Sequence, residues 1–491
     1  MHAMGPPPRQ VLAGTAWLLH DTAATRALES AALHTTPAHA LMQRAGLACA
    51  RLAMALAPHA RTVWVAAGPG NNGGDGMEAA MHLQRWGREV VVTCLGDPAS
   101  APADAAASRQ RALKAGVAFA DEVPAQWDLC VDALLGIGAT RPPQGVMAQW
   151  IARMRACDAP VLAIDIPTGL DADTGNAATD GVIASATICL LTLKPGLFTA
   201  DGRDMAGQVW LDTLQSDTTV AAAGDSATAQ LIARANRDLR RHASHKGNYG
   251  DVAIVGGAPG MAGAAVLAAS ASLHAGAGRV FLCTLDPRAA SVGVPTQPEL
   301  MLRDIRTLAI DGMTVVCGCG SGDAVREHLP GVLSRAPTLV LDADALNAVA
   351  TDGELQQLLT RRAARGALTV LTPHPLEAAR LLQTTARDVQ GHRLDAARRL
   401  AARYRCTVVL KGSGTVVAAL DHTPAINPTG NALLATAGSG DVLAGLIGAR
   451  LAAGMAAFDA ACASVFQHGE VADQWPANTA LTAAALARAL H

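Results

Sequence analysis

Three polar clusters in the first half of the chain contain the residue types that bind a cation and a phosphate. They lie in GPGNNGGDG (68–76), DLCVDALLGIGATR (128–141) and AIDIPTGLDADTG (163–175). The side chains whose hard oxygen atoms suit a monovalent or divalent cation are Asn71, Asn72, Asp75, Asp132, Asp165 and Thr168. The glycines allow backbone N–H groups to approach a phosphate. In the alternative interpretation, each glycine serves a tight turn and each aspartate caps the next helix.

The glycines of the first cluster also match a dinucleotide-binding turn. Gly68, Gly70 and Gly73 have the spacing G-x-G-x-x-G, and Asp97 follows where a ribose-binding acid is expected. This spacing alone has a high false-positive rate. The asparagines and Asp75 inside the turn also argue against an ordinary cofactor site, because a hydride-transfer cofactor needs no such oxygen-rich turn.

The second half of the chain has residues suited to phosphoryl chemistry. In NPTGNALLATAGSGDVLAG (427–445), the segment Gly438–Gly440 precedes a predicted long helix, so its amides can face a phosphoryl group. Asp441 follows, either as a base for a substrate hydroxyl or as a helix cap. KGSGT (411–415) is either a nucleotide cradle or a plain hairpin turn. No lysine follows a glycine, which excludes a P-loop.

Five further stretches are candidate site segments: TPHPLE (372–377), HKGNYGD (245–251), GMAGAA (260–265), GCGSGD (318–323) and LDADALN (341–347). His374 lies between two prolines, just after a predicted strand. A histidine there is either a catalytic group or a hydrogen-bonded structural side chain.

Short β-branched runs alternate with stretches of helical length, and this pattern predicts two α/β domains in tandem. The first alternation begins at TVWVAA (62–67) and the second at DVAIVGG (251–257). Between them, QSDTTVAAAGDSATAQ (215–230) is small, polar and aperiodic, as in a linker. We therefore expect a disordered tail over 1–15, a Rossmann-like three-layer sandwich over 16–218, a linker over 219–240 and a second α/β domain over 241–491.

Composition excludes several functional classes for this chain of 491 residues. No apolar run reaches the ~18 residues of a membrane-spanning helix, although 50% of the residues are hydrophobic. The formal net charge is −2 without a dense basic block, so we expect no nucleic acid partner. The ten cysteines contain no C-x-x-C pair, and MHAMGPPPRQ is unlike a secretory signal. These features favour a cytoplasmic protein with reduced thiols.

The order of motifs resembles two known enzyme families. NNGGDG, VDALLGIGAT and IDIPTGLDADTG resemble the NAD(P)HX epimerases. HKGNYGDVAIVGG, GMAGAA, TPHPLE, KGSGT and NPTGNALLATAGSGDVLAG resemble the ribokinase-like ADP- or ATP-dependent NAD(P)HX dehydratases. The whole is similar to the bacterial bifunctional NAD(P)H-hydrate repair enzymes, from about residue 15 onward.

The resemblance implies two linked activities on NAD(P)H whose nicotinamide ring has been hydrated. The first domain would interconvert the R and S hydrates. The second would dehydrate the S form, using ADP to turn the ring hydroxyl into a phosphate and releasing AMP and phosphate. Magnesium is expected with the phosphoryl transfer. A homo-oligomer is expected by analogy only.

The resemblance also assigns site residues. The hydrate in the first domain would contact Asn71, Asn72, Gly73, Gly74, Asp75, Gly136, Ile137, Gly138, Ala139, Thr140, Arg141, Pro142 and Asp165, with Asp165 nearest the chemistry. A potassium ion would bind Asn72, Asp132 and Thr168. The adenine nucleotide would bind Lys411, Gly412, Ser413, Gly414, Thr415 and Gly440. The second hydrate site would comprise Ala265, Gly320, His374 and Asp441, with Asp441 as the base.

The sequence departs from the families' pattern at three places. Thr168 replaces a commoner serine and keeps the hydroxyl. Leu376 stands where glycine is usual, and GCGSG replaces a Gly-Pro-Gly-Leu-Gly turn. The last two leave open the fine shape of the second pocket, though not its chemical groups. The sequence as a whole does not decide the preference between ADP and ATP. The alternative function is a kinase for a small vitamin precursor, fused to a nucleotide-binding module without catalytic activity.

Overall fold

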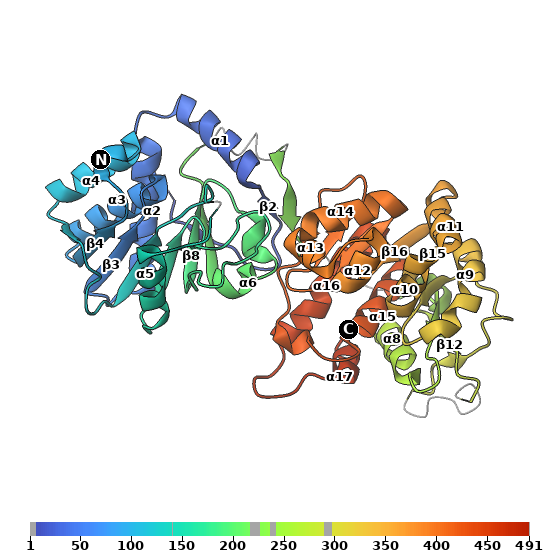
Figure 1. Cartoon of the computed structure of the whole chain (residues 1–491). Coiled ribbons are helices and arrows are strands. Elements are labelled where there is room, and N and C mark those ends of the chain that lie inside the picture. Colours follow the sequence, from blue (N-terminus) through green and yellow to red (C-terminus); the bar gives the residue numbers. More distant parts are fainter. Residues whose placement is uncertain (1–5, 140, 217–225, 236–241, 289–296, 491) are drawn as a thin grey trace. The chain divides into compact units, whose positions relative to one another are not determined.

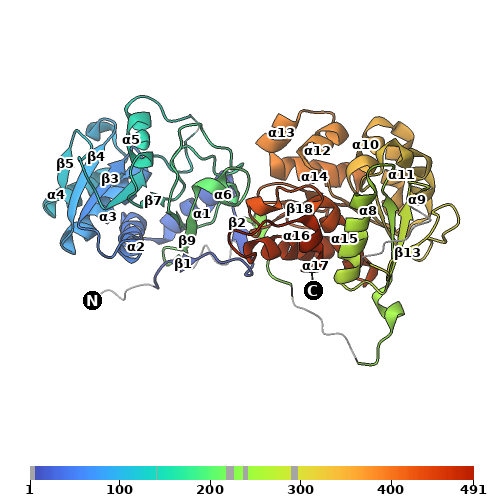
Figure 2. The same ribbon diagram turned by 90° about the horizontal axis from the view of Figure 1, so that it is seen from below.

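The chain forms two compact units, each with its own sheet and core. The computed structural model describes residues 6–139, 141–216, 226–235, 242–288 and 297–490 (Figures 1 and 2). The first unit comprises Met1–Leu12 and Trp17–Gln230, and the second comprises Ala13–Ala16 and Leu231–His491. This boundary falls within 219–240, where a short strand, β10 (Ala229–Leu231), lies. In the described part of the chain, no helix is long and apolar enough to cross a bilayer.

The first unit is built on one mostly parallel sheet with the strand order β1-β9-β8-β7-β6-β3-β4-β5. The strands are β1 (Arg9–Gln10), β3 (Thr62–Ala67), β4 (Glu89–Cys94), β5 (Ala118–Ala120), β6 (Leu129–Ala133), β7 (Val161–Ile164), β8 (Ala186–Leu190) and β9 (Gln208–Asp212). Only β1 and β9 pair antiparallel. A further short strand of this unit is β2 (Trp17–Leu19). The polar clusters thus follow the carboxyl ends of the neighbouring strands β3, β6 and β7.

Helices cover both faces of this sheet. They are α1 (Thr22–Thr35), α2 (Ala40–Leu56), α3 (Asn71–Arg85), α4 (Ala103–Lys114), α5 (Val146–Arg155) and α6 (Gly202–Met205), with 3-10 turns at Pro98–Ser100 and Pro195–Phe198. Side chains of β3 alternate between the faces. Val63 and Val65 pack with α2, α3 and α4, whereas Trp64 packs with α5. The predicted three-layer α/β sandwich is confirmed.

The amino-terminal segment differs from the disordered tail that the sequence predicts. Arg9 and Gln10 form β1, which pairs with Leu211 and Trp210 of β9. The Arg9 guanidinium also lies 5.0 Å from the ring centre of Trp17. The edge of β9 offers unpaired backbone groups, and hydrogen bonds to an edge need no apolar pattern in the added strand. The composition of this segment therefore does not indicate that it forms a strand.

The second unit contains a larger sheet whose core strands are also parallel. Its strand order is β13-β12-β11-β14-β15-β16-β17-β18-β19, and only β18 and β19 run antiparallel to their neighbours. The strands are β11 (Asp251–Gly256), β12 (Arg279–Thr284), β13 (Met301–Leu302), β14 (Thr314–Cys317), β15 (Thr338–Leu341), β16 (Leu368–Leu371), β17 (Thr407–Leu410), β18 (Val416–Ala418) and β19 (Ala425–Ile426). The second alternation in the sequence is therefore confirmed as an α/β unit.

Helices of the second unit lie on both faces of its sheet (Figure 2). They are α8 (Ala262–His274), α9 (Leu329–Arg335), α10 (Ala343–Thr351), α11 (Gly353–Ala364), α12 (Pro375–Leu382), α13 (Ala386–Gly391), α14 (Arg393–Tyr404), α15 (Ser439–Ala452), α16 (Ala457–Asp473) and α17 (Ala483–Arg488), with 3-10 turns at Lys246–Tyr249, Gly322–Glu327 and Ala432–Leu434. Helix α15 is buried along most of its length against α8, α16 and the sheet. A Cβ atom on Gly445 would lie 2.0 Å from the Ala268 carbonyl oxygen. Glycine at this position therefore allows the close approach of α15 to α8 that places the amino terminus of α15.

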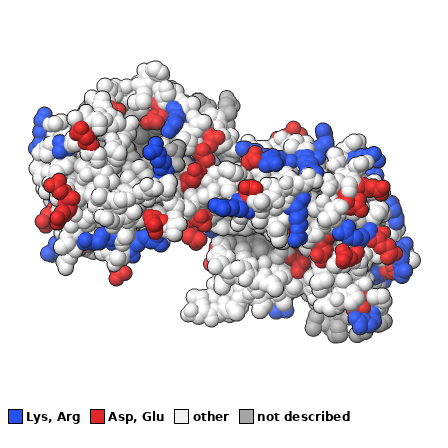
Figure 3. All heavy atoms as spheres, viewed as in Figure 1, with Lys and Arg blue, Asp and Glu red and all other residues white. Residues whose placement is uncertain are grey.

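Charged side chains of both signs are mixed on the face shown in Figure 3. This face has no extended basic patch. A protein that binds nucleic acid through its phosphates usually concentrates Lys and Arg on one surface.

Candidate active sites

A cavity of about 470 Å³ lies beside the polar clusters of the first unit. Its wall comes from α1, α2, the amino terminus of α3 and the segments that follow β6, β7 and β8. The predicted site residues that line it are Asn71, Asn72, Asp75, Gly136, Ile137, Gly138, Ala139 and Asp165. The other predicted residues with described positions, Gly73, Gly74, Arg141, Pro142, Asp132 and Thr168, do not line it. Thr140 lies outside the described residues.

Three glycines of GPGNNGGDG allow close packing at the start of α3. A Cβ atom on Gly68 would lie 1.8 Å from the Leu134 carbonyl oxygen, and one on Gly73 would lie 2.0 Å from the Gly68 carbonyl oxygen. On Gly74 it would lie 2.9 Å from the Ala105 Cα atom of α4. Gly73 and Gly74 lie within α3, so close packing, and not a turn conformation, accounts for glycine at these positions, while Asn71, Asn72 and Asp75 line the cavity.

The amino terminus of α3 faces this cavity. Gly70 is its cap, and Asn71 and Asn72 are its first residues. The first amides of a helix have no partner within it, and the helix dipole adds positive potential there. This end of α3 is therefore suited to an anionic group such as a pyrophosphate.

Asp132 and Thr168 form a buried network that joins the segments after β6 and β7. Both residues have no exposed surface. The Thr168 hydroxyl donates to Asp132 at 2.7 Å, and its amide donates at 2.8 Å. The Leu134 amide also donates to Asp132 at 3.2 Å, and the Leu135 amide donates to the Thr168 hydroxyl at 3.0 Å. Burial raises the pKa of Asp132 to about 6, although these hydrogen bonds oppose it.

Asn72 lies next to this network and has an unsatisfied buried atom. Its Nδ2 atom has no hydrogen-bond partner. A Cβ atom on Gly136 would lie 3.5 Å from the Asn72 amide carbon, so Asn72 adjoins the segment that follows Leu134 and Leu135. A buried amide without a partner is costly in a folded protein. The unpartnered amide of Asn72 therefore points to a ligand that would contact this side chain in the active enzyme.

Asp165 and Lys194 form an ion pair at the wall of the cavity. Asp165 follows β7 with φ of 69°, a conformation uncommon outside glycine. Its side chain is 14% exposed, while Lys194 has no exposed side-chain surface. The Lys194 ammonium donates to Asp165, to the Leu190 carbonyl at 3.2 Å and to the Thr192 carbonyl at 3.0 Å. Lys194 belongs to no recognisable motif in the sequence, although it is one of only four lysines in the chain.

Other carboxyl groups surround Asp165 in the cavity. Glu29, Asp75 and Asp104 all contribute to its lining. Burial, followed by the charges of Asp165 and Glu29, raises the pKa of Asp75 well above its usual range. Burial and Asp165 raise the pKa of Glu29 as well. The cavity therefore holds Asp165, in an ion pair, beside Asp75 and Glu29, whose pKa values are raised, which is a common arrangement for acid–base chemistry.

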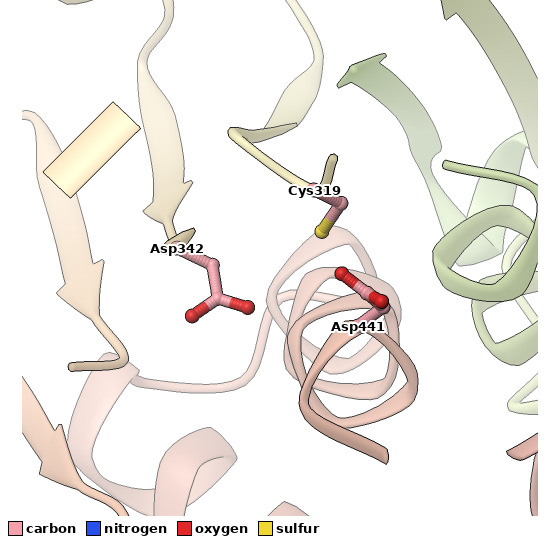
Figure 4. Close-up of side chains that lie close together, drawn as sticks. All are labelled: Cys319, Asp342 and Asp441. Carbon is pink, nitrogen blue, oxygen red and sulfur yellow. The ribbon is translucent and has the colours of Figure 1, made fainter. Parts of the chain in front are cut away.

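The second unit has its own acidic cluster at the amino terminus of α15. Asp441 is the third residue of this helix, and the cap is Gly438 with φ of 89° and no side-chain capping bond. The capping interpretation of Asp441 is therefore wrong. Its carboxyl oxygen, that of Asp342 and the sulfur of Cys319 lie within 4.8 Å of one another (Figure 4). Asp342 follows β15, and Cys319 follows β14.

The environment of Asp441 favours its protonated form. Burial, followed by the charge of Asp342, raises its pKa to about 6, against a hydrogen bond with Cys319 and the charge of Lys411. Burial raises the pKa of the Cys319 thiol well above its usual range, and Asp441 adds to this. Cys319 is therefore a neutral thiol and a hydrogen-bond partner of Asp441. A base with a pKa near neutrality is suited to exchanging a proton with a hydroxyl.

Lys411 connects KGSGT to this cluster. Its ammonium donates to Asp342 at 2.6 Å, and the Thr372 hydroxyl donates to the same oxygen at 2.8 Å. Burial lowers the pKa of Lys411, but the carboxylates of Asp342 and Glu377 outweigh this and leave it raised. A Cβ atom on Gly440 would lie 3.3 Å from the Lys411 ammonium. The cation thus lies beside the first amides of α15, where both attract a phosphoryl group.

The rest of KGSGT is the turn of a hairpin between β17 and β18. Gly412 and Gly414 have φ values of 132° and 60°, which only glycine adopts readily. The Thr415 hydroxyl donates to the Gly412 carbonyl at 3.1 Å. The hairpin interpretation is therefore confirmed. It does not exclude nucleotide binding, because Lys411 begins the turn and reaches the acidic cluster.

His374 has the hydrogen bonds of a structural residue. It caps α12, and its Nδ1 atom accepts from the amides of Leu376 at 3.1 Å and Glu377 at 3.3 Å. Its Nε2 atom lies 3.1 Å from the Glu377 carboxylate. Gly320, with φ of 56°, directly follows Cys319, whereas Ala265 is 1% exposed within α8. Their contact with a substrate stays a prediction.

Sequence comparisons match both units to known families. A family model described as NAD(P)H-hydrate dehydratase matches residues 252–491. Another, described as YjeF-related protein N-terminus, matches residues 38–196. The first range contains Asp342 and Asp441, and the second contains Asp75 and Asp165.

Two relatives that are similar in sequence agree with these family matches. The bifunctional NAD(P)H-hydrate repair enzyme Nnr of Escherichia coli (strain K12) is 38% identical over 450 residues, which cover 88% of this chain and 84% of the relative. The ADP-dependent (S)-NAD(P)H-hydrate dehydratase of Neisseria meningitidis serogroup B is 46% identical over 255 residues, covering 50% of this chain and 84% of the relative. The crystal structure of an ADP/ATP-dependent NAD(P)H-hydrate dehydratase from Bacillus subtilis covers 52% of this chain and 92% of its own, with 29% identity and a TM-score of 0.45.

Proposed function

The chain belongs to the family of bifunctional NAD(P)H-hydrate repair enzymes, and we propose that its two acidic sites catalyse the two steps of this repair. The first unit epimerises the R and S hydrates of NADH and NADPH. The second dehydrates the S form with ADP, releasing AMP and phosphate. The observation that carries the proposal is Asp441 at the amino terminus of α15, beside Lys411 and within the dehydratase match.

The second unit supplies a base and an anion site for the dehydration. Asp441 accepts the proton of the ring hydroxyl as that oxygen attacks the terminal phosphoryl of ADP. The first amides of α15 and the Lys411 ammonium stabilise the charge on the transferred group. The ring then bears a phosphate, a far better leaving group than hydroxide. Its departure, with a proton from the neighbouring ring carbon, restores NAD(P)H.

Magnesium fits the acidic cluster of the second unit. Mg²⁺ commonly binds one or two carboxylates together with the phosphates of a nucleotide. Asp342 provides a carboxylate oxygen within 4.8 Å of the Asp441 carboxyl, so the ion would bind on the Asp342 side and leave Asp441 free to act as the base. The ion would neutralise phosphoryl charge during transfer. The protein residues bind, orient and deprotonate the hydrate.

The first unit provides acid–base groups for the epimerisation. Inverting the carbon that carries the hydroxyl requires a bond at that carbon to break and to re-form on the other face. Breaking and re-forming this bond needs one group that accepts a proton and one that returns it. Asp165, paired with Lys194, is placed to accept it, and the amino terminus of α3 is placed to hold the pyrophosphate.

Potassium would bind Asn72, Asp132 and Thr168 next to the first cavity. The buried, unpartnered amide of Asn72 supports this, because rotating the amide would present its oxygen to an ion. The Asp132 carboxylate and the Thr168 hydroxyl add oxygen atoms of the hard type. The ion would supply positive charge that offsets the burial of the Asp132 carboxylate.

The decisive experiment uses the purified chain with mixed hydrate epimers. With ADP, we expect the absorbance of reduced nicotinamide to recover, with release of AMP and phosphate. Asp441→Asn should abolish recovery. Asp165→Asn should leave the S hydrate repairable and the R hydrate unrepaired. No recovery with either ADP or ATP would refute the proposal, and a stable phosphorylated product would favour the small-molecule kinase instead.

We also propose a cytoplasmic location, because all ten cysteines are free thiols, and retain the prediction of a homo-oligomer.

A further inference from the structure

Lys194 is a fully buried lysine directly behind the wall of the first cavity. Its ammonium donates to Asp165 and to the carbonyl oxygens of Leu190 and Thr192. An ammonium group has three N–H donors, so these three acceptors use all of them. Lys194 itself does not line the cavity. A ligand in the cavity therefore meets Asp165, and Lys194 can act on it only through Asp165.

A charge in this place is costly for a purely structural residue. Burying an ammonium group removes its hydration, and an ion pair repays that loss only in part. An apolar side chain of the same length would fill the volume without this cost. The lysine therefore needs another explanation, and its ion pair with Asp165 provides one.

The backbone of Asp165 is also held in an uncommon conformation. Its φ is 69°, and its amide donates to the Ile188 carbonyl at 2.7 Å. Backbone outliers of this type gather at functional sites, where the surrounding structure maintains them. Here the turn after β7 brings the side chain to the cavity wall. Lys194 then limits the directions in which the carboxylate can point.

Several other polar side chains could compete for contacts with the Asp165 carboxylate. Glu29, Asp75, Asp104 and Arg26 line the same cavity. A carboxylate in such surroundings keeps one direction only where a donor holds it from a fixed position. Lys194 contacts Asp165 from the protein side, away from any ligand.

We propose that Lys194 is a positioning residue of the epimerase site. It keeps the Asp165 carboxylate directed into the cavity, without touching the substrate. The inference rests on the proposed epimerase function of this unit. It adds a residue whose contribution is to the rate of the proton transfer and not to the binding of the hydrate.

The test compares Lys194→Met, Lys194→Gln and Asp165→Asn with the wild-type chain. Interconversion of the hydrate epimers is followed by chromatography without nucleotide, so that the dehydratase is idle. Dehydratase activity on the S hydrate with ADP then shows whether each variant chain is intact in its second unit, and circular dichroism checks the fold. Lys114→Met is the matched control, because Lys114 is exposed at the end of α4. It should behave as wild type.

We expect Lys194→Met to lower the epimerase kcat by about 100-fold, the scale of a general base effect, with KM within about threefold of the wild-type value. The double variant with Asp165→Asn should lose no more activity than Asp165→Asn alone, because the two residues act as one unit. Lys194→Gln keeps N–H donors without the charge, so it separates a folding defect from a lost ion pair. Its kcat should fall while the fold is kept.

Three results would overturn the inference while leaving the proposed function intact. They are a folded Lys194→Met or Lys194→Gln variant with wild-type kcat, a loss confined to KM, and losses that multiply in the double variant. A wild-type chain that fails to interconvert the epimers would instead refute the proposed function of the first unit.

Discussion

The Asp441 carboxylate should support dehydration and lower the free energy of unfolding. Asp441→Asn should therefore abolish dehydratase activity and make the second unit more stable. Burial and Asp342 raise the pKa of Asp441 from 3.8 to about 6. Each pKa unit corresponds to about 1.36 kcal/mol, so ionising this group in the folded state costs about 3 kcal/mol. The folded protein binds the proton more tightly than the unfolded chain between these pKa values. The free energy of unfolding therefore falls as pH rises from about 4 to 6, and the deficit stays complete above that.

Asparagine resembles the protonated carboxyl and removes this cost. We expect Asp441→Asn to stabilise the second unit by about 3 kcal/mol at pH 7.5 and by almost nothing near pH 4. Its dehydratase activity should be lost. In the wild-type chain, kcat/KM for dehydration should fall about tenfold for each pH unit below about 6, because the base becomes protonated.

Scanning calorimetry at both pH values measures the stability difference. The transition of the second unit is identified by its shift to higher temperature with ADP in the wild-type chain. Asp421→Asn is the control, because Asp421 is exposed between β18 and β19. If Asp441→Asn is no more stable than wild type at pH 7.5, or equally stabilised at pH 4, the reasoning from burial and charge is wrong.

Three further predictions address other parts of the molecule. Replacing potassium by choline should slow epimerisation and leave dehydration within about twofold, because the proposed ion lies beside Asn72 in the first unit; equal losses in both assays would contradict this. Lys411→Met should raise the KM for ADP and lower the dehydratase kcat by about 100-fold, and unchanged steady-state kinetics would exclude a phosphoryl role for the ammonium. Gly445→Ala should destabilise the second unit by about 1–3 kcal/mol, since its Cβ atom would meet the Ala268 carbonyl at 2.0 Å. Denaturant titration measures this loss. The control is Gly353→Ala, which has open space around its Cβ position and should change the free energy of unfolding little.

Local patterns were enough to predict the architecture. Apolar runs such as TVWVAA became buried parallel strands, and the alternation with helical stretches became two α/β units. The motifs lie at strand ends because polar and glycine residues interrupt apolar runs there. Asn72, Asp75 and Asp165 do face one cavity, as parallel strands with a common edge require.

Other site features depend on contacts between distant segments. Gly73 and Gly74 are ligand-binding candidates in the sequence, and the structure adds that a Cβ atom there would meet Gly68 and Ala105. Asp342 belongs to a stretch noted as a candidate, but only its approach to Lys411 shows a role. His374 lies in a suggestive motif, and its bonds to Glu377 show a cap. Residue type and spacing in the sequence do not show which segments far apart in the chain lie close together in the fold.

The sequence by itself determined the two units, their order, and the chemical groups available at each strand end. Periodicity and motifs are properties of short segments, so they can be read from the sequence without knowing which distant segments come together. The tertiary structure decided which of these groups act together. Lys194 pairs with Asp165, and Lys411 pairs with Asp342 beside Asp441, because the sheets bring separate loops to a common edge. Burial at that edge then sets the charges, since a carboxyl group removed from water holds its proton unless a cation or a hydrogen-bond donor is near.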